Sequence, residues 1–361
     1  MESHKQLSDL VILEKLKNQK NQNCSFSCQI HKTQKKIKLE ADAIDPTPKY
    51  QHTWYLKRSP YLPEYIADAE LDCFREVIAQ ELLRLLNPAY PKTRLVKSDL
   101  PYFRHVISKE IPGFQLLSNI VPFAKLENKI INQKYRMLGF AAIAALFVNE
   151  IDFKLANLGV SSEGEIIKID GGRSFMDFDK DGWDDDKIRL ANYNITAKDL
   201  NLCPKIKNYQ AYTWLDEFRF SYYFLADHLP ENLPSIRAEI NEAILKIILL
   251  PDELINDFVK HYLDSEKYQQ IFYQEICKRR NMFRAEAIKL ESFRNYLQSD
   301  QANKLLTSFI QSLQEFKLTK KTKLDMPRFE PIITSFYEVY LKNTTPTVEK
   351  ETTSPSKSRG L

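Results

Sequence analysis

Glycine is scarce in this 361-residue chain: there are eight glycines, and the first is Gly113. A glycine-rich loop that wraps a phosphate group needs several glycines directly after a strand. The first 112 residues therefore contain no loop of this kind.

Cysteines and long apolar runs are also few. The five cysteines are odd in number and irregularly spaced, which argues against a disulfide framework and for a reducing compartment. The longest apolar run, LGFAAIAALFV, has 11 residues, about half of the ~20 that a membrane-spanning helix needs. The first 23 residues have no apolar core of the signal-peptide type. We expect a soluble protein without a transmembrane segment.

Charge of one sign is not in large excess either. The net charge is +4, which is too small to indicate nucleic-acid binding by itself. With 43% hydrophobic residues, the chain is long enough to bury a large core in two or three lobes.

Strand patterns dominate the first third of the chain. Short β-rich runs occur in CSFSCQI, KIKLEA, HTWYLKR, TRLV and YFRHVISKEI, and DAELDCFREVIAQELLRLL between them has helical periodicity. Further on, we expect one long helix over about 124–150 and a hairpin in LGVSSEGEIIKIDGG, whose Ser-Glu-Gly turn separates two alternating runs. Residues 207–340 are helical by periodicity, as in YTWLDEFRFSYYFLADHL and YQQIFYQEICKRRNMFRAEAIKLESFRNYL.

The pattern predicts an α+β protein with a β-rich lobe followed by a helical lobe. We expect the following division: an N-terminal helix or arm at 1–22, the β-rich lobe at 23–120, a helical lobe at 121–230, a basic helical region at 231–342 and a disordered tail at 343–361.

The stretch NEIDFKLANLG at 149–159 places an acid, a base and an amide close together after the apolar run. Asp152 is followed by Lys154 at +2 and Asn157 at +5, and Asp170 comes 13 residues after Asn157, before two glycines. Lys57 lies upstream in HTWYLKR. This set suits phosphoryl transfer, in which one Asp orients the attacking hydroxyl, Asn and a second Asp hold metal, and Lys binds the phosphates.

These residues resemble the protein kinase superfamily. DFKLAN looks like the catalytic loop, in which Asp and Asn are five residues apart, and DGG looks like the metal-binding D-F-G element. The resemblance implies a bilobal kinase-like fold over roughly 23–225, with catalytic Asp152 and Lys154 and the metal ligands Asn157 and Asp170. It also implies that ATP and Mg²⁺ or Mn²⁺ are cofactors, and that Lys57 binds the nucleotide.

In kinases a helix glutamate holds the nucleotide lysine. CFREVIAQELLRLL resembles the corresponding helix of phosphatidylinositol kinases, which favours Glu76 as the partner of Lys57. Helix geometry places Glu76 nearly opposite the apolar stripe, whereas Glu70 and Glu81 flank it. The choice among Glu70, Glu76 and Glu81 stays open.

The chain also departs from ordinary kinases. Glu150-Ile151 stands where they have His-Arg, and no A-P-E follows. Lys32, Lys35 and Lys36 are candidates to contact the phosphates in place of a glycine-rich loop. The resemblance is therefore to atypical kinases of the HipA and phosphatidylinositol-kinase type, and to effector kinases secreted by intracellular bacteria such as Legionella. For such an effector we expect the host cytoplasm or a peripheral position on host membranes.

The function expected from these residues is ATP- and Mg²⁺-dependent phosphotransfer to a protein or lipid. Two alternatives remain: a kinase-fold module that binds phosphoinositide membranes or inositol polyphosphate, and a relative that transfers AMP.

Basic residues gather late in the chain. They are Lys278, Arg279, Arg280, Arg284, Lys289 and Arg294, expected on one helix, followed by Lys317, Lys320, Lys321, Lys323 and Arg328. Either this is a solvated face, or Lys278–Arg294 and Lys317–Arg328 contact an anionic phosphoinositide membrane or an inositol polyphosphate activator.

Two further stretches match known metal-binding patterns only in part. DFDKDGWDDDKI at 177–188 begins like a calcium loop, but its twelfth residue is Ile188 where such loops have Glu. Cys24, Cys28 and His31 give three zinc ligands without a clear fourth, so buried small residues and a surface His are the simpler interpretation.

Overall fold

A computed structural model describes most of the chain between Ser25 and Asn343. The described residues are 25–30, 35–40, 52–58, 66–97, 104–175, 193–206, 213–215, 225–231, 233–318 and 322–343, and for the first three of these ranges the backbone alone is described. The predicted N-terminal arm, the calcium-like loop at 177–188 and the predicted disordered tail beyond Asn343 lie outside these residues.

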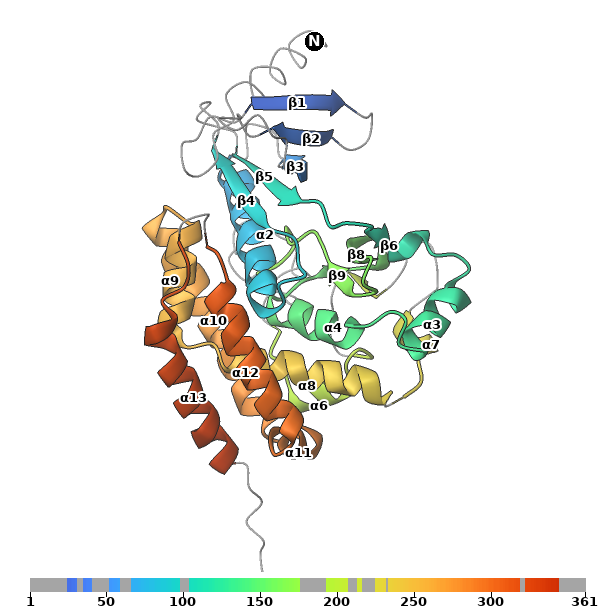
Figure 1. The fold of residues 1–361 in the computed structure, drawn as a ribbon, viewed down its shortest axis with the longest axis vertical. Helices are drawn as coiled ribbons and strands as arrows, with labels where there is room; N and C mark the ends of the chain where they lie inside the picture. Colours follow the sequence, from blue (N-terminus) through green and yellow to red (C-terminus); the bar gives the residue numbers. More distant parts are fainter. Residues whose placement is uncertain are drawn as a thin grey trace, which may run out of the picture.

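Five antiparallel strands form the largest sheet (Figure 1). They are β1 (Ser25–Ile30), β2 (Lys35–Glu40), β3 (His52–Arg58), β4 (Thr93–Lys97) and β5 (Arg104–Lys109), in the order β1-β2-β3-β5-β4. All five correspond to predicted strands. The helix expected in the same region is α2 (Ile66–Leu86), which packs against β4 and β5. Leu95 and Val106, paired across these two strands, join Phe74 and Val77 of α2 in the buried core.

The prediction of one long helix over 124–150 is wrong, because two helices occupy that stretch. They are α3 (Phe123–Ile131) and α4 (Leu138–Phe147). Gln133 and Met137 between them have φ values of 55° and 73°, a left-handed conformation that no helix continues through. The link is also tied to a distant segment, since Arg136 N–H donates to the Gly164 carbonyl at 2.9 Å.

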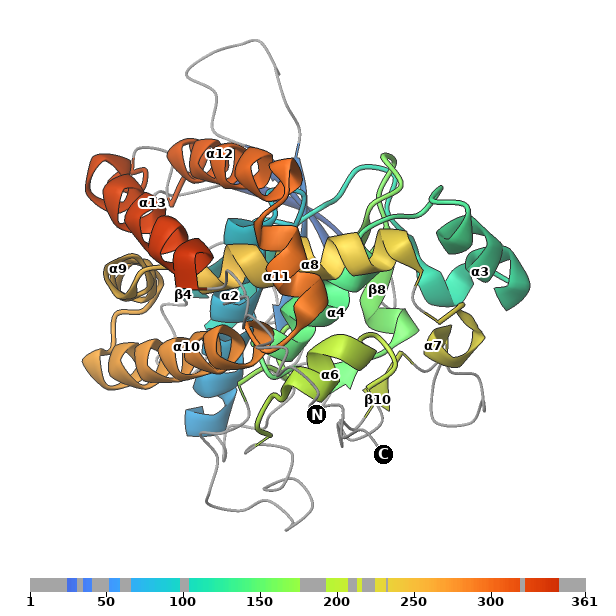
Figure 2. The same ribbon diagram turned by 90° about the horizontal axis from the view of Figure 1, so that it is seen from below.

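Helix α4 is the buried centre of the molecule, and all ten of its residues are buried. It lies beside α8 (Pro234–Ile248), as Figures 1 and 2 show. The two backbones approach closely at Gly139, where a Cβ would lie 2.5 Å from the Ile236 carbonyl oxygen. Glu239 of α8 accepts hydrogen bonds from Met137 N (2.6 Å) and Gly139 N (2.9 Å). An acid of another helix thus caps the N-terminus of α4.

The predicted hairpin after residue 157 is confirmed. Strands β8 (Leu158–Val160) and β9 (Ile166–Lys168) pair antiparallel, with Leu158 opposite Lys168, and β6 (Gln115–Leu116) adds a third strand. Gly164 in the turn has φ = 77°, which favours glycine. Two short elements precede β8, namely β7 (Asp152–Phe153) and the 3₁₀ turn η3 (Leu155–Asn157).

The rest of the described chain is mainly helical. It contains α6 (Ala197–Leu202), β10 (Thr213–Trp214), α7 (Leu225–His228), α9 (Asp252–Tyr262), α10 (Glu266–Ala287), α11 (Glu291–Leu297), α12 (Asp300–Glu315) and α13 (Met326–Asn343). The stretch that begins YTW was predicted helical throughout, but Thr213 and Trp214 instead form a parallel pair with Asp152 and Phe153 of β7.

Two helices replace the single one predicted over the basic stretch at 278–294. Helix α10 ends at Ala287 and α11 begins at Glu291. Arg294 Nη1 donates to the Ile288 carbonyl at 2.9 Å, which stabilises the bend between them. Phe283 before the bend and Phe293 after it are both buried, so the apolar periodicity continues although the helix axis does not.

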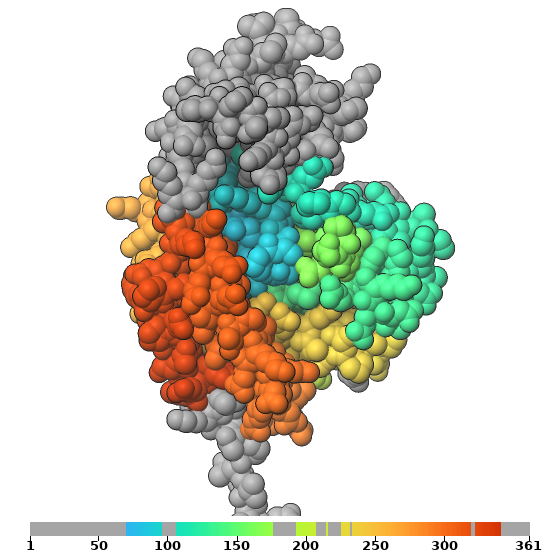
Figure 3. All heavy atoms as spheres, in the orientation of Figure 1, coloured from blue at the N-terminus to red at the C-terminus, as the bar shows by residue number. Residues whose placement is uncertain are grey.

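The protein is therefore mixed α+β, as predicted, and most of its described elements are helical. In Figure 3, α2 (blue) lies between the C-terminal helices (orange to red) and the β8–β9 segment (green). Within the described ranges, the helices are all too short or too polar to cross a membrane.

Candidate active site

Three residues of NEIDFKLANLG, namely Asp152, Lys154 and Asn157, are in contact. Lys154 Nζ lies 2.7 Å from Asp152 Oδ2, and Asn157 Nδ2 donates to the same oxygen at 3.1 Å and to the Asp152 carbonyl at 2.8 Å. The carboxylate of Asp152 thus has a fixed orientation. The side chains of Asp152 and Lys154 are 18% and 20% exposed, so a ligand can reach them.

Local chain geometry explains this arrangement. Lys154 is extended, with φ −107° and ψ 164°, and it precedes the single turn of η3. This turn brings Asn157 back over Asp152, and the Asn157 N–H donates to the Lys154 carbonyl at 2.9 Å. Pairing of β7 with β10 holds the other side of the loop.

Asp170 is brought to Asn157 by the hairpin. Strand β8 begins directly after Asn157 and β9 returns antiparallel to it, so that Ile169 N–H donates to the Asn157 carbonyl at 2.9 Å. Asp170 has φ = 60° and its Oδ1 accepts from Gly172 N at 3.4 Å. This left-handed conformation is unusual for Asp and is often found at functional sites.

Asn157 and Asp170 carry oxygen atoms of the kind that bind a magnesium ion. Because Nδ2 of Asn157 donates to Asp152, its Oδ1 is the atom that can ligate a cation, and Asp170 adds a carboxylate. Mg²⁺ prefers such oxygen ligands and is often held by one or two protein groups together with substrate phosphates and water. Among the described residues, no group of three or more His, Cys, Asp or Glu side chains gathers for a metal, so a site here would depend on those additional ligands.

A buried ion pair connects the loop of Asp152 to that of Asp170. Glu150 Oε2 lies 2.7 Å from Lys168 Nζ, and both side chains are 0% exposed. Glu150 also accepts from Asp152 N at 3.0 Å and from Ser174 Oγ at 2.8 Å. Lys168 donates to the Asp170 carbonyl at 2.7 Å. Glu150, which stands in the unusual Glu-Ile pair, therefore connects the Asp152 backbone to the Asp170 backbone through Lys168.

Helix α2 closes the site from the side of the large sheet. A Cβ on Gly171 would lie 3.0 Å from Ala79 Cβ and 3.3 Å from the Glu76 carbonyl oxygen. With the Gln80 amide oriented to place its oxygen toward the loop, that oxygen accepts from Asp170 N (3.3 Å) and Gly171 N (3.1 Å). The glycine thus allows α2 to touch the backbone beside Asp170.

The three candidate partners of Lys57 differ in their surroundings. Glu81 is fully buried and pairs with Arg84 (2.6 Å) and Arg94 (2.7 Å). Glu76 is buried and its carbonyl oxygen lies beside Gly171, and Glu70 is half-buried near the start of α2. Glu81 is therefore engaged elsewhere, and Glu76 is the candidate whose backbone contacts the loop of Asp170.

Lys57 lies on β3, where its Cα pairs with Val106 of β5. The side chain of Lys57 lies outside the described atoms, as do those of Lys35 and Lys36 at the start of β2 and the whole of Lys32. The same holds for the zinc-like set: Cys28 pairs with Ile37 in the β1–β2 ladder, and its side chain is not described.

The late basic residues do not share one face. Arg279 and Arg280 are 1% exposed and donate to backbone carbonyls, Arg279 to Leu146 and Phe147 and Arg280 to Leu250. Arg284 is half-buried and donates to the Ile248 carbonyl at 2.9 Å. Lys278, Lys289 and Arg328 are exposed, and each lies beside an acid.

Four residues of the site were not predicted: Gln80, Glu150, Lys168 and Ser174. A signal existed for two of them, because Lys168 interrupts the apolar strand IIKI and Glu150 follows a fully apolar helix. Oppositely charged residues in two buried segments that flank one site indicate a pair.

No family model matches the chain, and no curated protein matches it either.

Proposed function

We propose that the chain is an ATP- and Mg²⁺-dependent phosphotransferase with a bilobal kinase-like fold. One observation carries the proposal: Asp152 is held between Lys154 and Asn157, and the β8–β9 hairpin brings Asp170 to Asn157. This supports transfer chemistry because a positioned base and a pair of oxygen ligands lie on two adjoining loops.

In the proposed reaction, the acceptor hydroxyl binds to the exposed carboxylate of Asp152. The Asp152 carboxylate orients the hydroxyl and accepts its proton as the oxygen attacks the γ-phosphorus, and the bond from that phosphorus to the bridging oxygen of ADP breaks. Lys154, 2.7 Å from Asp152, supplies positive charge beside the transferred group.

Asn157 and Asp170 would hold Mg²⁺, which neutralises charge on the phosphates and the leaving group. Lys57 on β3 would bind the nucleotide phosphates with Glu76 as its partner, and ATP would lie between the β-rich part and α4. The buried pair of Glu150 and Lys168 keeps the loops of Asp152 and Asp170 in a fixed relative position. The acceptor is a hydroxyl of a protein or a lipid.

Incubation with labelled ATP tests the proposal. Purified protein is given MgCl₂ and either γ-labelled or α-labelled ATP, with itself, a basic protein and phosphatidylinositol vesicles as acceptors. We expect label from the γ position on an acceptor and none from the α position. Label from the α position would instead identify AMP transfer, and Mg²⁺-dependent ATP binding without either label would identify a binding module.

Two variants assign the residues. Asp152→Asn should abolish γ-label transfer while Mg²⁺-dependent ATP binding remains, because Asp152 acts on the acceptor. Asp170→Asn should weaken both, because Asp170 acts through the metal. Circular dichroism and the midpoint of thermal unfolding check that each variant is folded. Full transfer in either folded variant would contradict the assignment.

A further inference from the structure

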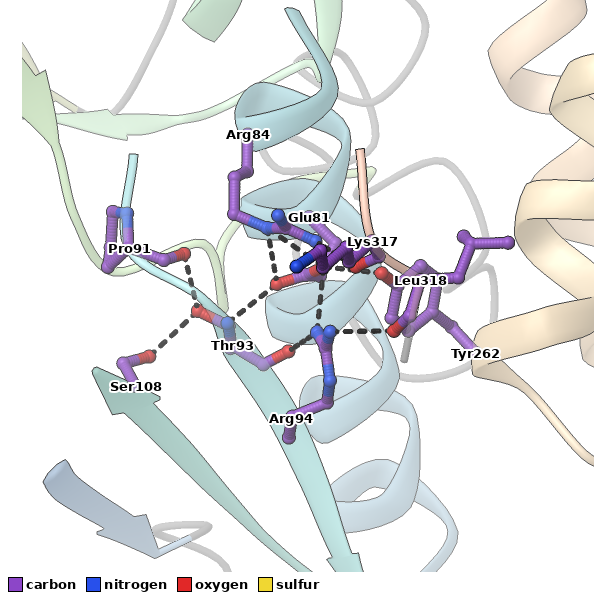
Figure 4. A network of polar contacts seen from close by, with 9 residues as sticks. All are labelled: Glu81, Arg84, Pro91, Thr93, Arg94, Ser108, Tyr262, Lys317 and Leu318. Carbon is purple, nitrogen blue, oxygen red and sulfur yellow. Dashed lines mark hydrogen bonds and ion pairs between the residues drawn. The ribbon is translucent and has the colours of Figure 1, made fainter. Parts of the chain in front are cut away.

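The C-terminal helices contact α2 through one buried carboxylate. Tyr262, the last residue of α9, donates its hydroxyl to Glu81 Oε2. Tyr262 is 181 residues from Glu81 in sequence, and both side chains are buried. Figure 4 shows the two side chains meeting between α2 and the C-terminal helices.

Glu81 collects further partners from the sheet. It accepts from Thr93 N at 2.7 Å and pairs with Arg94 at 2.7 Å, both on β4. Arg84, one turn further along α2, lies 2.6 Å from it. We call Glu81, Arg84, Thr93, Arg94 and Tyr262 the Glu81 cluster. It ties α2, β4 and α9 to one carboxylate.

A second C-terminal segment joins the same cluster. Arg94 Nη2 donates to the Leu318 carbonyl at 2.8 Å, and Arg84 Nη2 donates to the Lys317 carbonyl at 3.2 Å. These two carbonyls lie just beyond α12. The Arg84 guanidinium also stacks 4.0 Å above the ring centre of Phe316. The C-terminal region therefore holds α2 at two points.

The neighbouring residues of α2 contact the candidate metal loop. Ala79 and Gln80 directly precede Glu81 and touch Gly171 and the Asp170 backbone. An α-helix moves as a rigid body over such a short distance, so a shift of Glu81 shifts Gln80 as well. Helix α2 therefore connects the contact with Tyr262 to the backbone of Asp170.

The C-terminal region also holds the other half of the site. Arg279 of α10 donates from Nε to the Phe147 carbonyl (2.6 Å) and from Nη2 to the Leu146 carbonyl (2.5 Å). These are the last carbonyls of α4, and a cation at a helix C-terminus satisfies them and opposes the helix dipole. The loop that carries Asp152 begins two residues later.

We infer that Tyr262 and Arg279 are positioning residues, through which the C-terminal helices hold the two loops of the active site in place. This inference rests on the proposed function. Tyr262 positions the Asp170 loop by way of Glu81 and α2, and Arg279 positions the Asp152 loop by way of α4. The C-terminal helices are then an intramolecular brace of the enzyme.

Substitutions at Tyr262 and Arg279 should change different kinetic constants. Tyr262→Phe keeps the ring and removes the hydroxyl, so it should raise KM for Mg·ATP about tenfold with a small change in kcat. Arg279→Lys keeps the charge but cannot donate to the Leu146 and Phe147 carbonyls with the paired geometry of a guanidinium. It should therefore lower kcat about tenfold with a small change in KM. A purely structural role would only reduce the fraction of folded enzyme, which lowers kcat for both variants alike. Arg328→Ala, which removes an exposed ion pair between α13 and α9, is the matched control.

Amide hydrogen exchange measured by mass spectrometry tests the positioning separately from activity. Tyr262→Phe should speed exchange in peptides covering 169–174, and Arg279→Lys in peptides covering 149–157, while the control speeds neither. Uniformly faster exchange across the chain, or no change at these loops, would overturn the inference. If wild-type protein transfers no label but the exchange pattern holds, the proposed function fails and the brace stands.

Discussion

Glu150 and Lys168 form an ion pair that is completely removed from solvent, with Oε2 and Nζ 2.7 Å apart. Each partner also binds the backbone of one candidate acid, Glu150 at Asp152 N and Lys168 at the Asp170 carbonyl. The pair therefore sets the distance between the loop that would bind the acceptor and the loop that would bind the metal. The glutamate that departs from the kinase pattern is a structural part of the site.

Breaking the ion pair of Glu150 and Lys168 should strongly destabilise the fold. Glu150→Gln keeps a side chain that can accept from Asp152 N but leaves the Lys168 charge buried and unpaired. We expect it, and Lys168→Met, to lower the free energy of unfolding by about 3–5 kcal/mol. Urea denaturation followed by fluorescence measures this. The double variant Glu150→Gln/Lys168→Met removes both charges and should recover part of the loss. Single variants within 1 kcal/mol of wild type would contradict the role given to the pair.

Gly171 should not tolerate a methyl group. The added Cβ of Gly171→Ala would lie 3.0 Å from Ala79 Cβ, so α2 or the loop must move, at a cost of about 1–3 kcal/mol. We expect lower affinity for Mg·ATP, measured by calorimetry, because the loop carries Asp170. Ala79→Gly removes the opposing methyl group, so the double variant should bind better than Gly171→Ala alone. Additive losses would show that the contact with α2 is not the cause.

Lys154 should contribute to transfer rather than to nucleotide binding. Lys154→Ala removes the cation beside Asp152 and should lower kcat on the order of 10²-fold, a usual cost for one electrostatic contact to a transition state. KM for ATP should change little. Steady-state kinetics measures both constants, and Lys134→Ala, an exposed lysine between α3 and α4, is the control. An equal fall in activity for Lys134→Ala would indicate a general charge effect.

Stability should fall in acid through Glu81. Burial tends to raise the pKa of Glu81, but Arg94 and Arg84 outweigh it and hold this pKa below its ordinary value of 4.5. Glu81 therefore binds its proton less tightly in the folded chain than in the unfolded chain. Its stabilising contribution is complete above about pH 4.5 and is lost as the pH falls through the lower folded value.

Urea denaturation between pH 3 and 7 measures this loss. Glu81→Gln should be less stable at pH 7 and should lose less stability in acid than wild type does. Glu163→Gln, which changes an exposed acid, should follow wild type. Identical acid profiles for wild type and Glu81→Gln would rule out Glu81 as the source.

The sequence by itself determined the local parts of the molecule. Alternating apolar residues predicted the five strands and the β8–β9 hairpin, because side-chain period and turn residues act over a few positions. The grouping of Asp152, Lys154 and Asn157 was also predictable, since these residues lie within five positions of one another in the sequence. Asp170 followed from the hairpin that connects it to Asn157.

Only the tertiary structure decided which charges are buried. In the sequence Arg279 and Arg280 look like part of a solvated basic face, and Glu81 looks like a candidate for Lys57. Each is instead buried against partners far along the chain, such as the α4 carbonyls and Tyr262. The break between α3 and α4 likewise depends on the contact of Arg136 with Gly164. Periodicity reports the face that a residue occupies on its own helix, whereas its partner depends on which distant segment packs there.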